Sequence, residues 1–370
     1  MAAVKTVATI TYHRSDNFGS VLQAYALGEK LRQMGYDQFV IDYRKAEVAA
    51  AYAIFQPLTN KFNVITDCYR LLHYPALKRR KARFEQFRKQ RLRLSGVYAD
   101  KQALMDAPPA ADVYITGSDQ VWHTGILDFD GSYLLDFVKE GKKLSYAASG
   151  IKANTDETGL SVIRQGTEDF AAVSVRERIA KEKLGGSPTV VIDPVLLLTK
   201  QDWETICTEP RQKKPYMLCY FAGGVSADFE AFTREKARQM GLERVILMPE
   251  WRNIFRPGKP CYDAGPEEFV SLIAGASLVC TNSFHGTAFS VLLNKPFILG
   301  QAEPFADDRI ATFLAAVGLA DREIDPGKTA CADVTEQVDF THANAVLDRL
   351  RSRDTQWLRQ AIEGEDYDEE

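Results

Sequence analysis

A histidine stands where a helix is expected to begin. Residues 278–281 form the short apolar run of a buried strand, and after a polar turn residues 284–293 continue as a mostly apolar helix. Ser283 is placed to cap this helix, whose first backbone N–H groups have no partner within the helix and attract anions. His285 lies in that first turn and can exchange a proton near neutral pH. The stretch predicts an anion site with a proton donor, although a single histidine is often structural.

An arginine follows the end of another expected strand. Residues 172–175 are apolar or small, and Arg176 comes directly after them. A guanidinium group at a strand end can hold a phosphate or a carboxylate through two parallel hydrogen bonds. Arg176 could equally pair with the neighbouring Glu177 or with another acid. Anion binding and an internal ion pair both stay open.

Polar and aromatic residues follow a third expected strand, residues 112–116, in the sequence GSDQVW. Asp119 and Gln120 can hydrogen-bond adjacent sugar hydroxyls, and the ring of Trp122 can stack on the apolar face of a sugar. The pattern predicts a saccharide contact that also includes Ser118.

The N-terminal residues predict a βαβ unit, with a strand at residues 4–12, a helix at 21–34 and a second strand at 37–43. Ligands of parallel sheets bind at the carboxyl ends of strands, which is where Asn17 and Gly19 fall. The glycine spacing is not G-x-G-x-x-G, so no dinucleotide site is indicated. Asn17 and Gly19 either contact a ligand or only shape the turn.

The same alternation of strands and helices returns in the second half of the chain. It predicts an α/β fold with two Rossmann-like domains facing a cleft, as in GT-B glycosyltransferases, and mostly parallel sheets. We expect an N-terminal domain over residues 1–198, on the acceptor side, and a linker over 199–214. A C-terminal domain with the His285 site is expected over 215–362, and an acidic, disordered tail over 363–370.

Residues 77–94 predict a basic amphipathic helix. It carries nine Lys or Arg between Lys78 and Arg93 against one acid, Glu85, with phenylalanines on the other face. One interpretation is a peripheral contact of residues 78–93 with an anionic membrane surface. The other is a solvated helix that covers a core with its phenylalanines.

Composition excludes several classes of protein. The chain has 370 residues, a net charge of -4 and a pI near 5.9, which argues against a general nucleic-acid binder. Its six cysteines are scattered without a C-x-x-C pair, so neither a zinc site nor a disulfide framework is indicated. The N-terminus lacks a signal-peptide pattern, and no 18-residue apolar run occurs. We expect a cytoplasmic protein, with the basic helix as a candidate contact at the inner face of the membrane.

Five motifs, taken together, resemble the polysaccharide pyruvyl transferase family over roughly residues 5–320. They are NFGSVLQAYAL at 17–27, GSDQVW at 117–122, SVRE at 174–177, DPVLL at 193–197 and SFHG at 283–286. The resemblance implies a GT-B-like enzyme that transfers the pyruvyl group of phosphoenolpyruvate to a saccharide and leaves a cyclic ketal. It also implies a place in the synthesis of bacterial cell-surface polysaccharide, such as exopolysaccharide or capsule.

The resemblance implies roles for individual residues. It assigns His285 as the acid and Arg176 to phosphoenolpyruvate. Better-studied members carry Arg-Leu-His where this chain has Ser-Phe-His at 283–285, so an anion-binding arginine is missing beside the histidine. The helix N-terminus, with arginines from elsewhere such as Arg252 or Arg256, must then supply the positive charge for phosphoenolpyruvate.

A mechanism follows as a hypothesis. The phosphate and carboxylate of phosphoenolpyruvate are held by Arg176 and by the backbone N–H groups from Ser283 to Gly286. His285 protonates C3 of the enol, and a sugar hydroxyl that Asp119 orients or deprotonates attacks C2. The partners are phosphoenolpyruvate and an acceptor saccharide, free or lipid-linked, and the chemistry demands no metal and no cofactor.

Two other functions fit the same residues. A GT-B glycosyltransferase would hold the diphosphate of a sugar nucleotide at the helix that begins at Ser283. A non-catalytic relative would bind a saccharide or a lipid head group on the same fold, because a fold does not fix a function.

Overall fold

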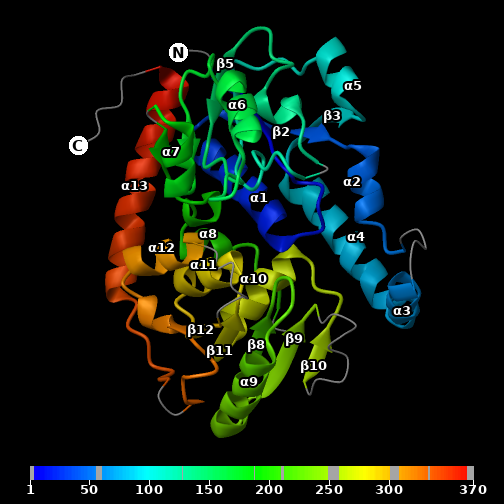
Figure 1. Ribbon diagram of the computed structural model, residues 1–370, viewed down its shortest axis with the longest axis vertical. Helices are drawn as coiled ribbons and strands as arrows, with labels where there is room; N and C mark the ends of the chain where they lie inside the picture. The colour runs from blue at the N-terminus through cyan, green and yellow to red at the C-terminus, as the bar shows by residue number, and fades with distance from the viewer. Residues whose placement is uncertain are drawn as a thin grey trace. The chain divides into compact units, whose positions relative to one another are not determined.

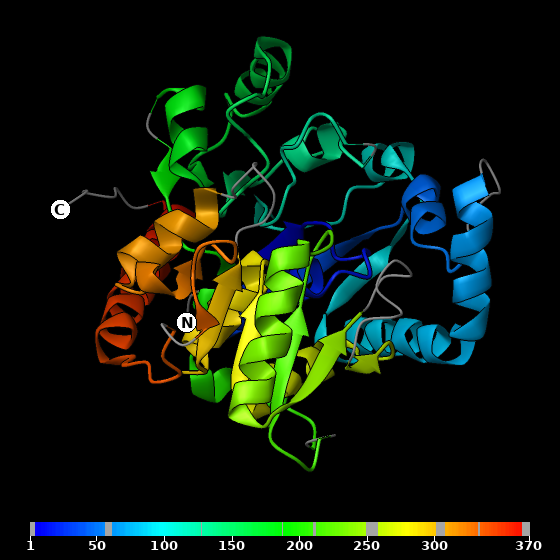
Figure 2. The same cartoon turned by 60° about the horizontal axis from the view of Figure 1, so that its bottom comes forward.

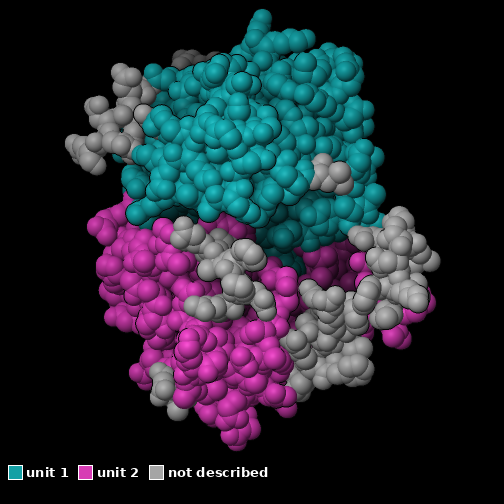
Figure 3. All heavy atoms as spheres, viewed as in Figure 1, with its two compact units in different colours: residues 1–53, 85–198, 350–370 teal, residues 54–84, 199–349 magenta. Residues whose placement is uncertain are grey.

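The computed structural model describes residues 4–55, 61–126, 128–186, 188–209, 212–248, 258–300, 308–331 and 334–364. The chain divides into two compact units, coloured separately in Figure 3. Unit 1 contains residues 1–53, 85–198 and 350–370, and unit 2 contains residues 54–84 and 199–349. Two of the boundaries fall inside helices, α4 (Tyr74–Arg91) and α13 (Thr341–Glu363).

Unit 1 is built on a parallel sheet with the strand order β3-β2-β1-β4-β5. Three of these strands, β2, β3 and β5, are labelled in Figure 1. The strands are β1 (Thr6–Ile10), β2 (Asp37–Tyr43), β3 (Leu94–Tyr98), β4 (Val113–Thr116) and β5 (Lys142–Ser145). A separate short parallel pair is formed by β6 (Ser174–Val175) and β7 (Thr189–Val190).

Both faces of the unit 1 sheet are covered. Successive strand residues point to opposite faces, so Val7 packs in a core cluster with residues of α1 (Phe18–Gln33) and α13. Its neighbour Ala8 packs on the other face, in a cluster with residues of η1 (Gly131–Leu134) and α6 (Glu157–Gly166). The other helices that lie wholly in unit 1 are α2 (Ala46–Ala51), α5 (Lys101–Asp106), α7 (Arg178–Leu184) and η2 (Pro194–Leu196). The central strands β1 and β4 are almost entirely buried as a result, whereas β3 at the sheet edge is partly exposed.

Unit 2 repeats the arrangement with a parallel sheet of order β10-β9-β8-β11-β12-β13. The strands are β8 (Tyr216–Tyr220), β9 (Glu243–Leu247), β10 (Lys259–Cys261), β11 (Leu278–Thr281), β12 (Phe297–Gly300) and β13 (Glu323–Ile324). One face packs against α9 (Ala227–Met240), as Figure 2 shows.

The other face of the unit 2 sheet is covered by aromatic contacts. Phe269 of α10 (Pro266–Gly275) lies 5.1 Å from Tyr220 of β8 and 5.7 Å from Phe289 of α11 (Phe284–Leu292), measured between ring centroids. The ring of Trp203, on α8 (Lys200–Glu204), lies 4.8 Å from Phe289. The other helices described in unit 2 are α3 (Lys61–Leu72), α12 (Asp308–Ala316) and η4 (Ala320–Arg322).

The α/β prediction with two mostly parallel sheets is confirmed. Three segments differ from the expected boundaries. The basic helix is α4 and ends at Arg91, because the chain turns into β3 three residues later. Residues 199–214, expected as a polar linker, contain α8 with the fully buried Trp203. Helix α13 continues to Glu363, and residues 365–370 of the expected tail lie outside the described part.

Within the described residues, no helix combines the length and the apolar character that a bilayer crossing requires.

Candidate functional site

The strand order of both sheets places a ligand crevice at a defined point. In open parallel sheets, ligands bind outside the carboxyl ends of two adjacent central strands. At this point the strand order reverses, so the chain connections leave these two strands toward opposite edges of the sheet. These strands are β1 and β4 in unit 1, and β8 and β11 in unit 2. Asn17 and Asp119 follow the first pair, and His285 follows β11.

In unit 1, the side chain of Gln23 joins the loops that follow β1 and β4. Its Nε2 donates to Thr11 Oγ1 at 2.8 Å, and its Oε1 accepts from the Ser118 backbone N–H at 3.1 Å. Thr11 Oγ1 in turn donates to the Ser118 carbonyl at 2.9 Å. All three residues are buried. These bonds fix the start of the GSDQVW loop against the end of β1.

Gly117 opens this loop because no side chain fits there. Its φ is +116°, and a Cβ atom would lie 2.3 Å from the Tyr146 carbonyl oxygen. The close approach of two backbone segments therefore requires glycine at this position.

The structure changes the expectation for two of the predicted saccharide contacts. Trp122 is 0% exposed, and its indole N–H donates to the Tyr133 carbonyl at 3.3 Å, so a sugar cannot stack on its ring. Ser118 is also fully buried, and its hydroxyl donates to the Ala147 carbonyl at 2.7 Å. Asp119 and Gln120 are partly exposed, and Asp119 Oδ2 accepts a hydrogen bond from the Ser20 hydroxyl.

Asn17 takes the turn-shaping role that the sequence left open. It is the N-cap of α1, and its Oδ1 accepts hydrogen bonds from the backbone N–H groups of Gly19, at 2.8 Å, and Ser20, at 3.3 Å. Gly19 is buried in the first turn of that helix. A ligand contact by either residue stays a prediction.

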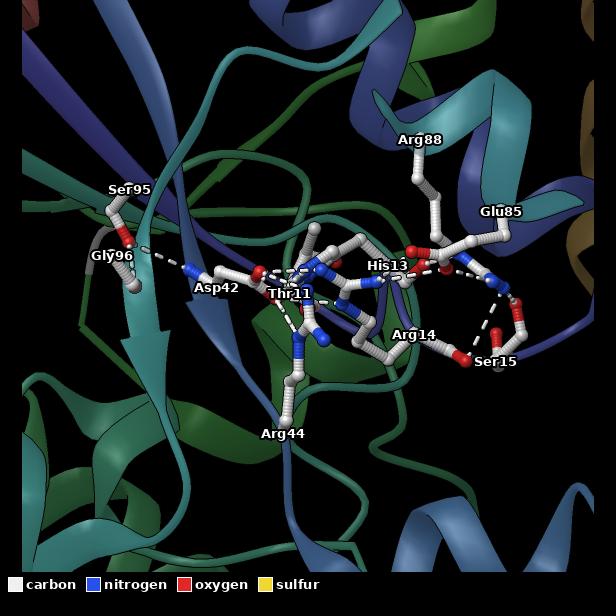
Figure 4. Close-up of polar contacts among 10 residues, drawn as sticks. All are labelled: Thr11, His13, Arg14, Ser15, Asp42, Arg44, Glu85, Arg88, Ser95 and Gly96. Atoms are coloured by element: carbon white, nitrogen blue, oxygen red, sulfur yellow. Dashed lines mark hydrogen bonds and ion pairs between the residues drawn. The ribbon is translucent and has the colours of Figure 1, made fainter. Parts of the chain in front are cut away.

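A buried ionic network holds the loop between β1 and α1 (Figure 4). Asp42 on β2 accepts hydrogen bonds from Arg14 Nε at 2.6 Å and from Arg44 Nη2 at 2.7 Å, and its Oδ1 lies 3.3 Å from His13 Nε2. Burial alone would raise the pKa of Asp42, but the hydrogen bonds of these partners hold it well below its usual range. Burial lowers the pKa of His13. The charge on Asp42 therefore persists across the physiological pH range.

Arg88 of α4 completes this network. Its guanidinium donates to the His13 carbonyl at 2.8 Å, to the Ser15 carbonyl at 2.6 Å and to Asp16 Oδ1 at 2.7 Å. Arg88 is 4% exposed, and Phe84 and Phe87 of the same helix are buried. The basic helix thus covers a core, as the second interpretation of its sequence proposed, and the membrane contact of residues 78–93 stays a prediction.

Arg176 lies in a buried ion cluster. Its Nη1 donates to Asp193 Oδ2 at 2.6 Å, its Nε donates to Glu177 Oε1 at 3.1 Å, and its Nη2 donates to Ser149 Oγ at 2.8 Å. The Ser149 hydroxyl itself donates to Glu177. The internal pairing with Glu177 that the sequence left open is therefore present, and two carboxylates already face this guanidinium group.

In unit 2, an amide side chain joins the two central strand ends as Gln23 does in unit 1. Asn282 Oδ1 accepts from the Ala222 backbone N–H at 2.7 Å, and its Nδ2 donates to the Gly224 carbonyl at 2.8 Å. The hydroxyl of Thr281 donates to the Tyr220 carbonyl at 2.7 Å. The loops after β8 and β11 are thereby fixed beside the first turn of α11.

The first turn of α11 packs tightly on the end of β11. A Cβ atom on Gly286 would lie 2.4 Å from Thr281 Oγ1, so glycine permits this approach. Ser283 is the N-cap residue as predicted, but its side chain makes no capping hydrogen bond. His285 is partly exposed, and its ring centroid lies 5.3 Å from that of Phe284. The first N–H groups of α11 and the His285 ring thus lie on the same helical turn.

A cation that the sequence did not single out acts on Tyr220, at the end of β8. Burial raises the pKa of Tyr220, and both a hydrogen bond with the Ser283 side chain and the charge of Arg80 oppose that rise. The Arg80 guanidinium carbon lies 4.6 Å from the ring centroid of Phe84. Arg80 belongs to unit 2. Arg252 and Arg256, the cations expected from the sequence, lie outside the described residues.

No group of three or more His, Cys, Asp or Glu side chains suited to a metal ion occurs in the described part of the chain.

A family model for polysaccharide pyruvyl transferases matches residues 17–299 of the chain. A structure from Listeria monocytogenes, titled as a UDP-N-acetylglucosamine 2-epimerase, covers 100% of this chain and 99% of its own at 11% identity and a TM-score of 0.53. A second UDP-N-acetylglucosamine 2-epimerase structure gives the same coverage, identity and TM-score. These similarities place the chain in the GT-B fold. No curated protein matches it significantly.

Replacing Gln23 tests the bridge between the loops of β1 and β4. We expect Gln23→Leu to destabilise the protein by about 1–3 kcal/mol, because it leaves the buried Ser118 N–H and Thr11 hydroxyl without their amide partner. Urea unfolding of wild type and variant measures this loss. The control is Gln33→Leu, on the exposed end of the same helix; equal stability of the two variants would contradict the role of Gln23.

Proposed function

Since this chain belongs to the polysaccharide pyruvyl transferase family, we propose that it transfers the pyruvyl group of phosphoenolpyruvate to a saccharide as a ketal. The family match over residues 17–299 is the observation that carries this proposal. The proposed product is a component of a bacterial cell-surface polysaccharide, such as exopolysaccharide or capsule. The reaction is placed in the cytoplasm, with a free or lipid-linked acceptor.

The donor site of this proposal is the first turn of α11 in unit 2. Phosphoenolpyruvate carries a phosphate and a carboxylate, and helix N-termini offer both N–H donors and a positive dipole end. The proposed donors are the N–H groups from Ser283 to Gly286, with Arg80 supplying the charge that relatives place beside the histidine. The electrostatic effect of Arg80 on Tyr220, which hydrogen-bonds Ser283, supports this choice.

The proposed reaction starts with proton transfer from His285 to C3 of the enol. A sugar hydroxyl oxygen then bonds to C2 and loses its proton to a carboxylate, for which Asp119 is the residue predicted from the sequence. The bond between C2 and the phosphate oxygen breaks, and phosphate leaves with the electron pair. A second hydroxyl closes the ketal at C2 and returns a proton to His285, while the proton held by the carboxylate passes to the departing phosphate. Both residues thus regain their starting protonation states.

Arg176 was assigned to phosphoenolpyruvate by resemblance, and this assignment stays a prediction. Its buried pairs with Asp193 and Glu177 support another role, because a guanidinium that already faces two carboxylates attracts a trianionic ligand less strongly. Holding the loops after β5 and β6 in place is the role that these contacts favour.

Replacing His285 tests the acid assignment. We expect His285→Asn to lower kcat on the order of 10²- to 10⁴-fold while phosphoenolpyruvate still binds, because only the proton transfer is lost. Phosphate release with phosphoenolpyruvate and a panel of methyl pyranosides measures turnover. The exposed His342→Asn is the control. A variant at position 285 with wild-type turnover would rule the assignment out.

Replacing Arg80 tests the source of positive charge. We expect Arg80→Gln to weaken phosphoenolpyruvate binding about tenfold or more, since hydrogen bonds and ion pairs to charged groups are among the stronger polar contacts. Calorimetric titration measures the Kd. The matched control is Arg79→Gln, on the neighbouring residue, whose side chain is 57% exposed and pairs with Asp263. If both variants bind phosphoenolpyruvate equally well, Arg80 does not contribute to the site.

Replacing Arg176 separates its two candidate roles. We expect Arg176→Lys to lower the free energy of unfolding by about 1–3 kcal/mol, because buried carboxylates lose hydrogen-bond donors, and to leave the Kd for phosphoenolpyruvate within a factor of two to three. Urea unfolding and calorimetric titration provide the two readouts. Unchanged stability with a tenfold weaker Kd would instead assign Arg176 to the donor.

A further inference from the structure

Unit 1 contains a pocket that the predicted site residues do not account for. It lies where β1 and β2 end, is partly open to solvent, and has room inside for about one water-sized group. Its lining includes three tyrosines, two cations and one acid: Tyr12, Tyr43, Tyr133, Arg14, Lys45 and Asp128. Aromatic walls with a few convergent polar groups are typical of small-molecule sites.

Tyr12 is one of the residues that line this pocket. Tyr12 is 7% exposed, and its hydroxyl makes no hydrogen bond with any residue that the structure describes. Its ring packs edge-on against Tyr133, with 4.5 Å between the centroids. Burial and the negative charges of Asp128, Asp119 and Asp130 raise its pKa, so the hydroxyl keeps its proton. A buried hydroxyl of this kind is an expected ligand contact, because polar groups in protein interiors are otherwise paired.

The two cations of the pocket are already paired. Lys45 Nζ lies 3.0 Å from Asp130 Oδ2, and Arg14 Nη1 lies 3.1 Å from Glu85 Oε2 while its other nitrogens bond Asp42. The pocket therefore presents no surplus positive charge to an anion such as phosphoenolpyruvate. A neutral ligand with several hydroxyls fits its charges better.

Asp128 differs from its neighbour Asp130. The Asp130 carboxylate accepts hydrogen bonds from Tyr43 at 2.8 Å and from the Ser132 N–H at 2.8 Å, in addition to its Lys45 pair. The Asp128 carboxylate makes no hydrogen bond or ion pair with the described residues. Half-buried beside Tyr12, it is an acceptor available to a ligand.

We propose that the acceptor saccharide binds over this pocket and inserts one hydroxyl group into it, where the Tyr12 hydroxyl donates to that group and the Asp128 carboxylate receives its proton. The inference rests on the proposed function and deepens it, because it names the acceptor side and a second carboxylate besides Asp119. The Asp119 carboxylate already accepts a hydrogen bond from the Ser20 hydroxyl, whereas the Asp128 carboxylate can still accept one from a ligand.

The electrostatics of the pocket suit a base. The pKa of Asp128 is raised to about 6: burial is the largest cause, Lys45 opposes it, and the charges of Asp130 and Asp119 add to it. Tyr12, Tyr43, Tyr133 and Tyr52 also face the pocket acids and stay protonated, since burial raises the pKa of each. A general base works best with a pKa near the working pH. Asp128 is ionised above pH 6 and accepts a proton more readily than an ordinary carboxylate.

The raised pKa of Asp128 predicts how the stability of the protein depends on pH. In the folded protein Asp128 stays protonated up to about pH 6, whereas in the unfolded chain it loses its proton near the ordinary pKa of 3.8. Between these two pH values the folded state binds more protons, so the free energy of unfolding falls as the pH rises. We expect Asp128→Asn to raise the Tm at pH 8 by about 2 °C or more and to change it less at pH 4.5. Thermal unfolding at both pH values measures the difference.

The ligand test uses saturation-transfer NMR with methyl glucoside, galactoside, mannoside and N-acetylmannosaminide as probes. We expect at least one pyranoside to bind the wild-type protein, and both Tyr12→Phe and Asp128→Asn to weaken its binding at least fivefold. The controls are Tyr36→Phe and Asp169→Asn. Tyr36 comes just before β2 and bonds Glu363, and Asp169 pairs with Lys143 near the start of β5. Their hydroxyl and carboxylate make protein contacts away from the pocket, so pyranoside binding should not change.

Two results would overturn the proposal: no pyranoside binding to the wild type, or binding that neither Tyr12→Phe nor Asp128→Asn weakens. Phosphoenolpyruvate titration in parallel separates this failure from failure of the proposed function. Donor binding without pyranoside binding refutes only the pocket. Pyranoside binding at the pocket without donor binding refutes the transferase and leaves a saccharide site.

Discussion

Strands of a parallel sheet end at one common edge, and the loops that leave this edge bring backbone N–H and C=O groups into the interior. These groups need partners, because an unpaired buried polar group costs as much as a lost hydrogen bond. In both units one amide side chain meets this need between the two central strands, Gln23 in unit 1 and Asn282 in unit 2. The two loops held in this way carry Asp119 in one unit and His285 in the other.

Charge is distributed differently around the two edges. In unit 1 the arginines close to the strand ends form pairs within the protein: Arg14, on the loop after β1, pairs with Asp42, and Arg88, on α4, pairs with Asp16 of that loop. Arg176, after β6, pairs with Asp193. They fix backbone and balance buried acids. In unit 2 burial raises the pKa of the Tyr220 hydroxyl, at the end of β8, and the Ser283 side chain and the Arg80 charge both oppose that rise. An anionic donor in unit 2 and a neutral acceptor in unit 1 agree with this difference.

The sequence was sufficient to predict the two parallel sheets and the position of His285 at a helix start, because strand length, helix period and turn residues are local properties. It was not sufficient for side chains whose direction depends on distant partners. Trp122 looked like a sugar contact, but its burial depends on the packing of η1 residues such as Tyr133. Ser283 was placed correctly at the cap, yet its hydroxyl is directed to Tyr220 on another strand. The sequence left open whether Arg176 binds an anion or pairs internally.

The pocket residues were missed for a related reason. Tyr12, Lys45 and Asp128 come from three separate loops, and no motif joins them in the sequence. One local sign was present, since Asp128 and Asp130 flank a phenylalanine in DFDG, an acidic pair in an otherwise apolar setting. Only the fold shows that Asp130 is paired with Lys45 whereas Asp128 is not.

The surplus of acids around Asp128 bears on how a product would leave. A pyruvyl ketal brings a carboxylate to a sugar that had none, so the acceptor would enter the pocket neutral and end the reaction as an anion. With Lys45 and Arg14 already paired, the new carboxylate would meet Asp128 without a compensating cation, and like charges at short range repel. The same arrangement that admits the substrate would thus expel the product and discriminate against sugars that are already acidic.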